Sequence, residues 1–214
     1  MTEYHRALST VAELDDWILE GPALLEQGEH GVVLSSVEDT TPSDGNFTLW
    51  CPEEFGDDVL IEWEFRPIGE PGLAMIFFAA TGHSGDLFGA GQAPRDGSYP
   101  QYHSGDINAL HVSYFRHKWA EERAFRTCNL RKSAGFHLVA RGADPLPPAE
   151  DATDFYRMSL RKVGPTIDFA INQLPLLHWV DTGEVRGPAL AGGRVGFRQM
   201  APLVAEYRNF TVSH

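Results

Sequence analysis

The sequence predicts an all-β sandwich, and three observations carry this prediction. Apolar and polar residues alternate with a period of two along short segments, as at 59–65, where Ile61, Trp63 and Phe65 share one face. Clusters of Gly, Pro and Asp separate these segments and indicate turns. Helical periodicity is scarce along the 214 residues. Eleven or twelve short strands bounded by turns are typical of two packed antiparallel sheets.

The elements are expected in the following order. A short helix is predicted near the start, where Thr10 and Glu13 have capping-box spacing ahead of Leu14, Trp17 and Ile18. Strands are predicted at 31–35, 47–50, 59–65, 72–80, 109–116, 125–131, 136–141, 155–162, 166–172, 176–180, 194–198 and 204–212.

Three further segments can be interpreted from their local sequence. The strand at 72–80 is apolar on both faces, which is expected for a strand covered by two layers. A helical turn is predicted at 118–125, and a loop rich in Pro and acidic residues at 144–154. Asn172-Gln173 lies where a tight hairpin would join two strands.

Composition indicates an ordinary globular protein, which we expect to form one jelly-roll domain over residues 1–214. Hydrophobic residues make up 43% of the chain, and the formal net charge is −13. We find no basic region followed by an apolar stretch at the N-terminus and no apolar run long enough to cross a bilayer. Cys51 and Cys128 fit neither a disulfide framework nor a zinc signature. These features favour a cytoplasmic protein.

Charge reverses between Tyr99 and Gly142, where seven Lys and Arg face three acidic residues and four His are added. A local cationic site in an otherwise anionic chain focuses its field on a small ligand rather than on a long polyanion. The ligand is therefore expected to be anionic or polyhydroxylated. Nucleic acid and membrane are not expected as partners, and the oligomeric state is not determined by the sequence.

Three segments resemble the YesU-like family, a bacterial group described mainly as a domain of unknown function. They are YHSGDINALH at 102–111, RTCNLRKS at 126–133 and GFRQMAP at 196–202, and the likeness extends from Trp17 to Arg208. The resemblance implies a concanavalin A-like lectin/glucanase jelly roll of two curved sheets, encoded among genes for the use of plant-derived saccharides. It implies no settled reaction and no catalytic residues.

A lyase acting on a uronic acid needs a cation or an amide to neutralise the carboxylate and a Tyr or His to move protons. In strand 109–116, alternation places Tyr114 and Arg116 on one face and His111 on the other. Tyr114, His111 and His137 are therefore candidates for base and acid.

The neutralising groups are expected in the next strand. Asn129 and Arg131 share a face there, presenting an amide beside a bidentate donor. Both are predicted to be catalytic, whereas Arg116 and Lys132 are predicted to bind substrate. An Arg131 paired with an acidic residue across the sheet is the alternative for this position.

Hydrolysis would need two carboxylates, for which Glu62 and Glu64 are the candidates, and both are predicted to bind substrate. Their spacing of about 7 Å along one strand decides nothing between the two hydrolytic classes. As ordinary surface residues they would instead take Arg66 as a counter-ion.

The rim of the cleft is predicted to carry aromatic and polar groups that bind a sugar. These candidates are Trp50, Tyr102, Tyr99, His103 and Arg198. No cofactor is expected, since the spacing of His and acidic residues fits no metal motif, although a structural divalent cation such as Ca²⁺ would suit loop oxygens.

The sequence favours, without deciding, an enzyme over a binding protein. The first hypothesis is a lyase or glycoside hydrolase acting on imported plant-derived oligosaccharides. A non-catalytic sugar-binding module is the alternative, since one fold serves both functions. A sugar isomerase or epimerase would use the same acid and base pair.

Overall fold

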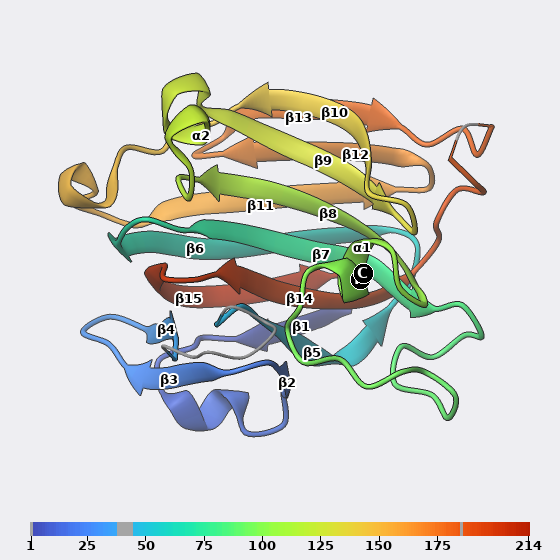
Figure 1. The fold of residues 1–214 in the computed structure, drawn as a ribbon, viewed down its shortest axis with the longest axis horizontal. Coiled ribbons are helices and arrows are strands. Elements are labelled where there is room, and N and C mark those ends of the chain that lie inside the picture. Colours follow the sequence, from blue (N-terminus) through green and yellow to red (C-terminus); the bar gives the residue numbers. More distant parts are fainter. Residues whose placement is uncertain (1, 38–44, 185) are drawn as a thin grey trace.

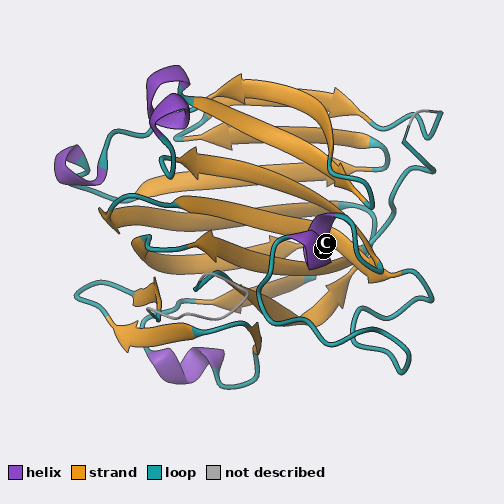
Figure 2. Ribbon diagram, viewed as in Figure 1, coloured by secondary structure: helices purple, strands orange, loops and turns teal. Residues whose placement is uncertain are grey.

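Two antiparallel β-sheets pack face to face in the computed structural model, which describes residues 2–37, 45–184 and 186–214. Sheet A has the order β13-β12-β11-β6-β15-β4-β3, with β1 paired beside β15, and sheet B has the order β10-β9-β8-β7-β14-β5-β2. Figure 1 shows the two sheets as layers, and Figure 2 shows how little helix accompanies them. The predicted all-β sandwich is confirmed.

The bounds of the elements are as follows. Sheet A contains β1 Glu3–Arg6, β3 Ala23–Gln27, β4 Val32–Ser36, β6 Val59–Gly69, β11 Tyr156–Val163, β12 Thr166–Ile171, β13 Leu174–Val180 and β15 Val204–Ser213. Sheet B contains β2 Ile18–Glu20, β5 Phe47–Phe55, β7 Leu73–Gly82, β8 Ile107–Arg116, β9 Thr127–Ser133, β10 His137–Ala143 and β14 Gly193–Met200. The helices are α1 Pro100–His103 and α2 Ala120–Phe125, with 3₁₀ turns at Val11–Leu14 and Ala149–Asp151.

The twelve predicted strands correspond to β4 through β15, and the three short strands β1, β2 and β3 were not predicted. The capping box predicted at Thr10 and Glu13 is present, but it begins a single 3₁₀ turn. Ile18 does not belong to that turn; it starts β2, which pairs with β5. The predicted hairpin at Asn172-Gln173 is also present, and both residues have the positive φ of a type I′ turn.

The main core lies between the sheets and follows the alternation of the sequence. Ile61, Trp63 and Phe65 of β6 point into it, as predicted from their shared face. β7 is buried on both sides because a second apolar cluster covers its outer face, where Phe77 packs under Tyr102. The segment 83–106, which contains α1, therefore covers part of the outer face of sheet B (Figure 2).

Tyr114 and Arg116 do not lie side by side, contrary to the alternation in the sequence. The register between β7 and β8 shifts where Ser113 pairs with Met75 and Phe115 pairs with Ala74, so Tyr114 is the extra residue of a β-bulge. Tyr114 turns into the core, fully buried, and Arg116 emerges on the outer face of sheet B.

Tyr114 is enclosed by aromatic rings from sheet A. Its ring meets those of Trp63 and Phe65, and its hydroxyl donates to the Tyr207 hydroxyl at 3.5 Å. Burial raises the pKa of the Tyr114 phenol well above its ordinary value. The residue has the surroundings of a core side chain rather than of a base that meets substrate.

Lys132 is also placed away from the outer face, because it alternates with Arg131 along β9. Its ammonium contacts both carboxylate oxygens of Asp181 at 2.8 and 2.9 Å, and it donates to the carbonyls of Gly187 and Pro188. Both side chains of this ion pair are buried. The prediction that Lys132 binds substrate is therefore wrong: this cation ties the segment after β13 to sheet B.

We expect Lys132→Met to destabilise the fold by about 3–5 kcal/mol, because it leaves the Asp181 carboxylate buried without a counter-ion. Chemical denaturation would measure this change in the free energy of unfolding. The double variant Lys132→Met/Asp181→Leu should recover most of the loss. As a control, Arg6→Gln breaks the exposed ion pair with Asp16 and should cost less than about 1 kcal/mol. A single variant as stable as the wild type would contradict the assigned role.

Candidate functional site

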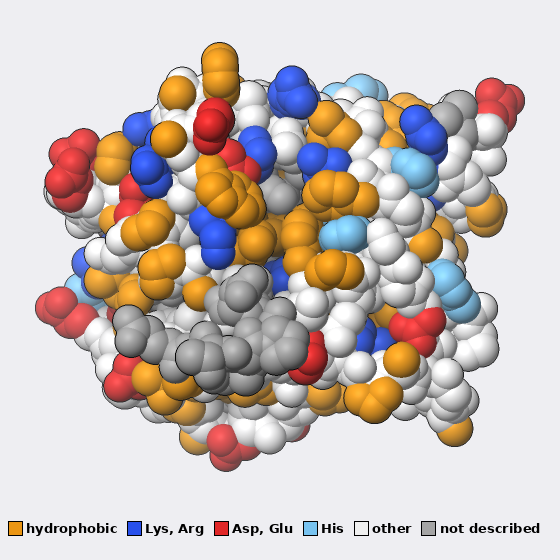
Figure 3. Space-filling view, in the orientation of Figure 1, with side chains coloured by type: hydrophobic (Ala, Val, Ile, Leu, Met, Phe, Trp, Pro, Cys, Tyr) orange, Lys and Arg blue, Asp and Glu red, His pale blue; other side chains and the backbone are white. Residues whose placement is uncertain are grey.

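The candidate site lies on the outer face of sheet B, where β8 and β9 run side by side. Their register sets His111 opposite Arg131 and Ser113 opposite Asn129. Side chains directly opposite each other on one face of an antiparallel pair are neighbours. In Figure 3, Lys, Arg and His side chains gather among hydrophobic ones over the half of this face where β8, β9 and β10 lie in Figure 1. Part of the cationic stretch of the sequence therefore contributes to one surface.

A groove of about 340 Å³ opens on this surface between α2 and the strands β8, β9 and β10. Its lining consists of Arg116, Glu121, Glu122, Phe125, Thr127, Asn129, Arg131 and Arg141. Three of the predicted site residues, Arg116, Asn129 and Arg131, are brought together in it. We call it the arginine groove.

The arginines of the groove differ in how they are held. Arg116 forms an ion pair with Glu122 at 2.6 Å and donates to Thr127 Oγ1 at 2.7 Å, so its charge is compensated. Arg131 donates to the carbonyl of Phe136 at 3.0 Å and lies 3.8 Å from the centre of that ring. Within the described part of the chain, neither Arg131 nor Arg141 has a carboxylate partner. The groove thus presents two uncompensated guanidinium groups to a ligand.

A hydrogen-bonded tyrosine and histidine lie beside Arg131. The Tyr99 hydroxyl is 3.0 Å from His111 Nε2, and the Tyr99 ring contacts the Phe136 ring on which Arg131 rests. His111 is fully buried and stacks on Phe77 at 4.6 Å, so only Tyr99 of this pair can reach a ligand. Tyr99 was predicted only as a rim residue, and its contact with His111 was not foreseen.

Electrostatics holds both members of the pair in their neutral forms. Burial lowers the pKa of His111 well below its ordinary value, and the positive charges of Arg131 and Arg198 lower it further. Burial raises the pKa of Tyr99 to about 12, against the opposing effect of the nearby arginines Arg198, Arg131 and Arg116. The cations that would hold an anionic ligand therefore also favour a phenolate at Tyr99.

Arg198 lies beneath the segment 83–106 rather than in the open groove. Its guanidinium is fully buried, between the rings of Tyr99 at 4.9 Å and Tyr102 at 4.4 Å. It donates to Thr48 Oγ1 at 2.9 Å and to the carbonyl of Gly97 at 2.7 Å. Arg198 thus fastens the covering segment to sheet B and positions Tyr99, a role different from the predicted ligand contact.

Two other predicted rim residues are also covered. Trp50 is fully buried under the same segment, where its indole donates to Glu20 at 2.8 Å, and Tyr102 stacks over it. His103 remains half-exposed beside Phe136, with ring centres 4.3 Å apart. His103 is therefore the predicted rim residue that a ligand in the groove can approach, together with Tyr99.

The remaining candidates lie elsewhere. Glu62 and Glu64 belong to β6, so they are on the outer face of sheet A, on the opposite side of the sandwich. Their partners are Arg157 and Arg208, not Arg66 and not Arg131. His137 pairs in register with the inward-pointing Lys132, which separates it from His111.

Five of the eight residues that line the groove were not predicted as site residues, among them Phe125 and Arg141. Phe125 is 75% exposed at the end of α2, although the sequence suggested that it began a strand. An exposed phenyl ring beside two arginines that lack a carboxylate partner among the described residues indicates a binding surface. The sequence alone does not show this, because the exposure of the ring is known only from the structure. Arg141 was counted in the cationic stretch, but its place opposite Asn129 follows from the register of β9 and β10.

In residues 2–37, 45–184 and 186–214, no group of three or more His, Cys, Asp or Glu side chains is arranged to hold an ion. Within the same ranges, none of the helices has the length and apolar character needed to cross a bilayer.

The fold is shared with proteins of known structure. A protein of unknown function with a galectin-like fold from Bacillus subtilis has 52% sequence identity and a TM-score of 0.93, covering 98% of this chain and 94% of that one. The carbohydrate-binding module CBM66 from the same organism has 9% identity and a TM-score of 0.56, covering 93% and 96%. A β-1,3-1,4-glucanase (lichenase) derived from a mouse hindgut metagenome has 11% identity and a TM-score of 0.64, covering 100% and 99%. The last two likenesses show the fold alone.

Sequence comparison shows the family. The uncharacterized protein YesU of Bacillus subtilis (strain 168) is 53% identical over 210 residues, which are 98% of this chain and 94% of YesU. The model of the domain of unknown function DUF1961 matches residues 2–212. The resemblance seen in the sequence is thus confirmed, and the chain belongs to the DUF1961 family, with a galectin-like sandwich of the concanavalin A-like superfamily.

Proposed function

We propose that this protein binds a uronate-containing oligosaccharide in the arginine groove and cleaves it by β-elimination. The observation that carries the proposal is the juxtaposition of two uncompensated arginines, Arg131 and Arg141, with the Tyr99–His111 pair. Arg131 connects the groove with the Tyr99–His111 pair, because it lines the groove and lies opposite His111. A carbohydrate ligand also agrees with the fold shared with a carbohydrate-binding module and a glucanase.

The arginines supply the first requirement of the reaction. Neutralising the uronate carboxylate makes the adjacent C5–H bond acidic, because the negative charge that develops there is stabilised by the cations. Arg131 and Arg141 have no competing carboxylate among the described residues, and each guanidinium can take a carboxylate in a bidentate manner. Phe125 provides an exposed ring against which the apolar face of a sugar can stack.

The Tyr99–His111 pair supplies the second requirement. The Tyr99 oxygen takes the proton from C5 while its own proton passes to His111 Nε2, and the C5 electron pair forms the C4=C5 double bond. The bond from C4 to the glycosidic oxygen breaks, and that oxygen receives a proton back from the pair. Protons and electrons balance without a co-reactant. His111 acts through Tyr99 and does not touch the substrate.

Hydrolysis has less support on this surface. Glu121 and Glu122 are the carboxylates of the groove, but they are adjacent on one short helix, and Glu122 is already paired with Arg116. Two carboxylates flanking a glycosidic bond are what that reaction requires. Glu62 and Glu64 face away on sheet A and are each paired with an arginine.

The setting proposed for this reaction is the cytoplasm, with an imported oligosaccharide as substrate. Both cysteines, Cys51 and Cys128, are free and buried, which is compatible with a reducing compartment. The second candidate function is a non-catalytic sugar-binding module, favoured by the fold shared with CBM66. In that case Tyr99 and Arg131 only hydrogen-bond the ligand, and no product forms.

We expect Arg131→Ala to lower kcat/KM on oligogalacturonides by about 10²-fold or more, because the developing charge loses its neutralising group. The ultraviolet absorbance of the unsaturated product measures turnover. Arg157→Ala is the matched control, since it removes an exposed arginine from sheet A and should leave the rate unchanged. Turnover of Arg131→Ala at the wild-type rate would exclude this arginine from the site.

Tyr99→Phe should lower kcat by about 10²- to 10⁴-fold and leave KM nearly unchanged, because the ring remains and only the proton-transfer group is lost. Tyr156→Phe, on β11 of the other sheet, serves as the matched control. Binding by the wild type with no product from any acidic oligosaccharide would instead support the binding module.

The pH dependence should reflect the lowered pKa of His111. An exposed histidine base would become protonated, and activity would fall, as the pH drops through about 6.5. Because the pKa of His111 lies well below this value, its imidazole stays neutral there and kcat/KM should remain level. A falling limb centred near pH 6.5 in steady-state kinetics would show that another group is the base.

A further inference from the structure

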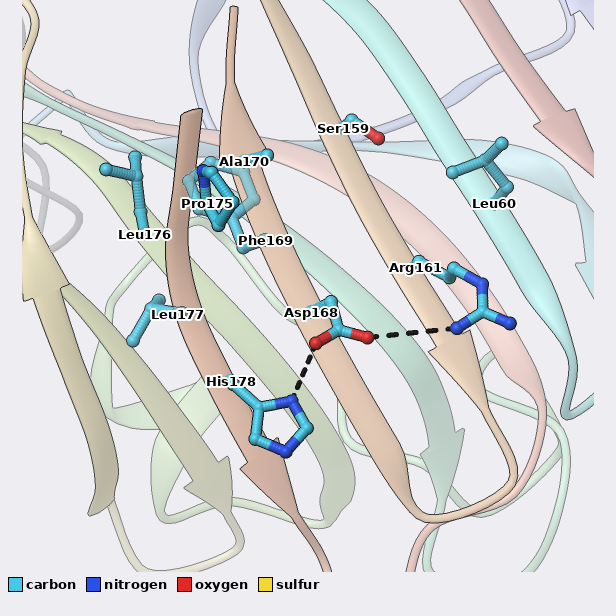
Figure 4. Close-up of a pocket in the computed structure, with 10 residues that line it drawn as sticks. All are labelled: Leu60, Ser159, Arg161, Asp168, Phe169, Ala170, Pro175, Leu176, Leu177 and His178. Carbon is cyan, nitrogen blue, oxygen red and sulfur yellow. Dashed lines mark hydrogen bonds and ion pairs between the residues drawn. The ribbon is translucent and has the colours of Figure 1, made fainter. Parts of the chain in front are cut away.

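The outer face of sheet A carries a second hollow, separate from the arginine groove. It has a volume of about 510 Å³ and lies over β11, β12 and β13, with apolar side chains on one side and polar side chains on the other. Figure 4 shows His178, Asp168 and Arg161 in a row across these three strands. The hollow faces away from Arg131, because the two sheets turn their outer faces in opposite directions.

The polar row is held in place by its own contacts. His178 Nδ1 is 2.7 Å from Asp168 Oδ1, and Arg161 lies 3.8 Å from the other carboxylate oxygen. The three residues are directly opposite one another in register. His178 Nε2 and the remaining N–H groups of Arg161 have no partner among the described residues. They are therefore oriented donors and acceptors that a ligand can use.

A β-bulge forms the apolar side. The register between β12 and β13 shifts where Phe169 pairs with Leu177 and Ala170 pairs with Pro175, so Leu176 is the extra residue. Bulges bend the strand that carries them and re-aim side chains, often beside binding sites. Here Pro175 lies in the wall of the hollow beside Ala170, whereas Leu176 lies on the far side of β13 and packs against the main core (Figure 4).

The hollow is not a serine hydrolase site, although it contains Ser, His and Asp. Ser159 pairs with Ala170 and lies two strands away from His178. Strands are about 4.8 Å apart, so the Ser159 hydroxyl is roughly 10 Å or more from the imidazole. A triad needs those two groups in hydrogen-bond contact. The row is therefore suited to binding rather than to nucleophilic catalysis.

Charge identifies the class of ligand. The arginines of this part of the face are each paired with a carboxylate: Arg161 with Asp168, Arg157 with Glu62, and Arg208 with Glu64. A smaller hollow of about 160 Å³ is lined by residues of β6, β11 and β15, among them Glu62 and Arg157. The face is thus polar but close to neutral, unlike the arginine groove.

From this geometry we infer that the hollow on sheet A is a second saccharide-binding site, and that it takes a neutral sugar. The vicinal hydroxyls bind His178, Asp168 and Arg161, which offer donors and acceptors in one row, and the apolar face of the sugar packs on Pro175 and Ala170. Glu62, expected from the sequence to bind substrate, lies two residues beyond Leu60 on the same face of β6, where the next sugar unit would extend.

Titration of the ¹⁵N-labelled full-length protein with cellobiose, xylobiose and galactobiose tests this inference. We expect at least one of these neutral disaccharides to give saturable shifts in the amide signals of 159–178, with little dependence on salt. Asp168→Asn should weaken that binding by about tenfold or more, since hydrogen bonds to a charged group are lost. Asp16→Asn, which breaks an equally exposed ion pair elsewhere, is the matched control and should leave the affinity unchanged.

The outcomes separate this site from the arginine groove. Arg131→Ala should not alter the binding of the neutral disaccharide, and digalacturonate should shift signals of β8 and β9 instead. The inference is overturned if none of the three disaccharides shifts 159–178 at millimolar concentration, or if Arg131→Ala removes the binding. It is equally overturned if digalacturonate is the ligand that saturates 159–178. These binding results do not depend on turnover in the arginine groove, so a failure of the proposed lyase activity would not overturn the inference.

Discussion

The position of Tyr99 beside the arginine groove depends on one buried guanidinium. Arg198 lies between the rings of Tyr99 and Tyr102 and donates to Thr48 and to the backbone of Gly97, so it joins β14, β5 and the segment 83–106. Burying a cation is costly unless its charge is stabilised, and here the two rings and two acceptor oxygens stabilise it, although the guanidinium Nε has no hydrogen-bond partner among the described residues. The segment it holds covers part of sheet B and leaves the part beside α2 open. The contact between Arg198 and the Tyr99 ring also places the Tyr99 hydroxyl beside His111.

The two faces of the sandwich use similar residue types with opposite results. On sheet A, arginine and carboxylate side chains alternate across neighbouring strands and compensate each other. On sheet B, Glu122 compensates Arg116 alone, and Arg131 and Arg141 keep their charge available. A positive electrostatic field focused in a groove attracts anions. A surface whose charges are paired instead recognises the shape and hydroxyl geometry of a ligand. The net charge of the chain does not reveal this difference between the two faces, because the difference depends on which strands are neighbours.

Much of the fold could be predicted because it follows from the local alternation of apolar and polar residues. In β6, each residue's face follows from its neighbours, and the turn at Asn172-Gln173 follows from its position between two strands. The site was predicted in part for the same reason: Asn129 and Arg131 share a face of one regular strand. Tyr114 was misplaced because a single bulge reverses the alternation, and no sequence signal in Ser113-Tyr114-Phe115 marks it.

Other errors came from contacts between distant parts of the chain. Lys132 belongs to the cationic stretch, yet its partner Asp181 is 49 residues away and faces the interior. Tyr99 and His111 lie in different elements, and their contact depends on how segment 83–106 folds back over sheet B. Strand order, not spacing, separates Glu62 and Glu64 from Arg131. Such relations depend on tertiary structure, which periodicity does not report.

The opposite placement of the two hollows limits how one saccharide chain can use both. Stacked sheets are about 10 Å apart, and each hollow opens outward, so a chain that reached from one to the other would have to wrap around the edge formed by β10 and β13. A short oligosaccharide cannot span that path, and its two sites would fill independently, with no gain in avidity. A long polymer with acidic and neutral stretches would instead be bound at two separated points along its length.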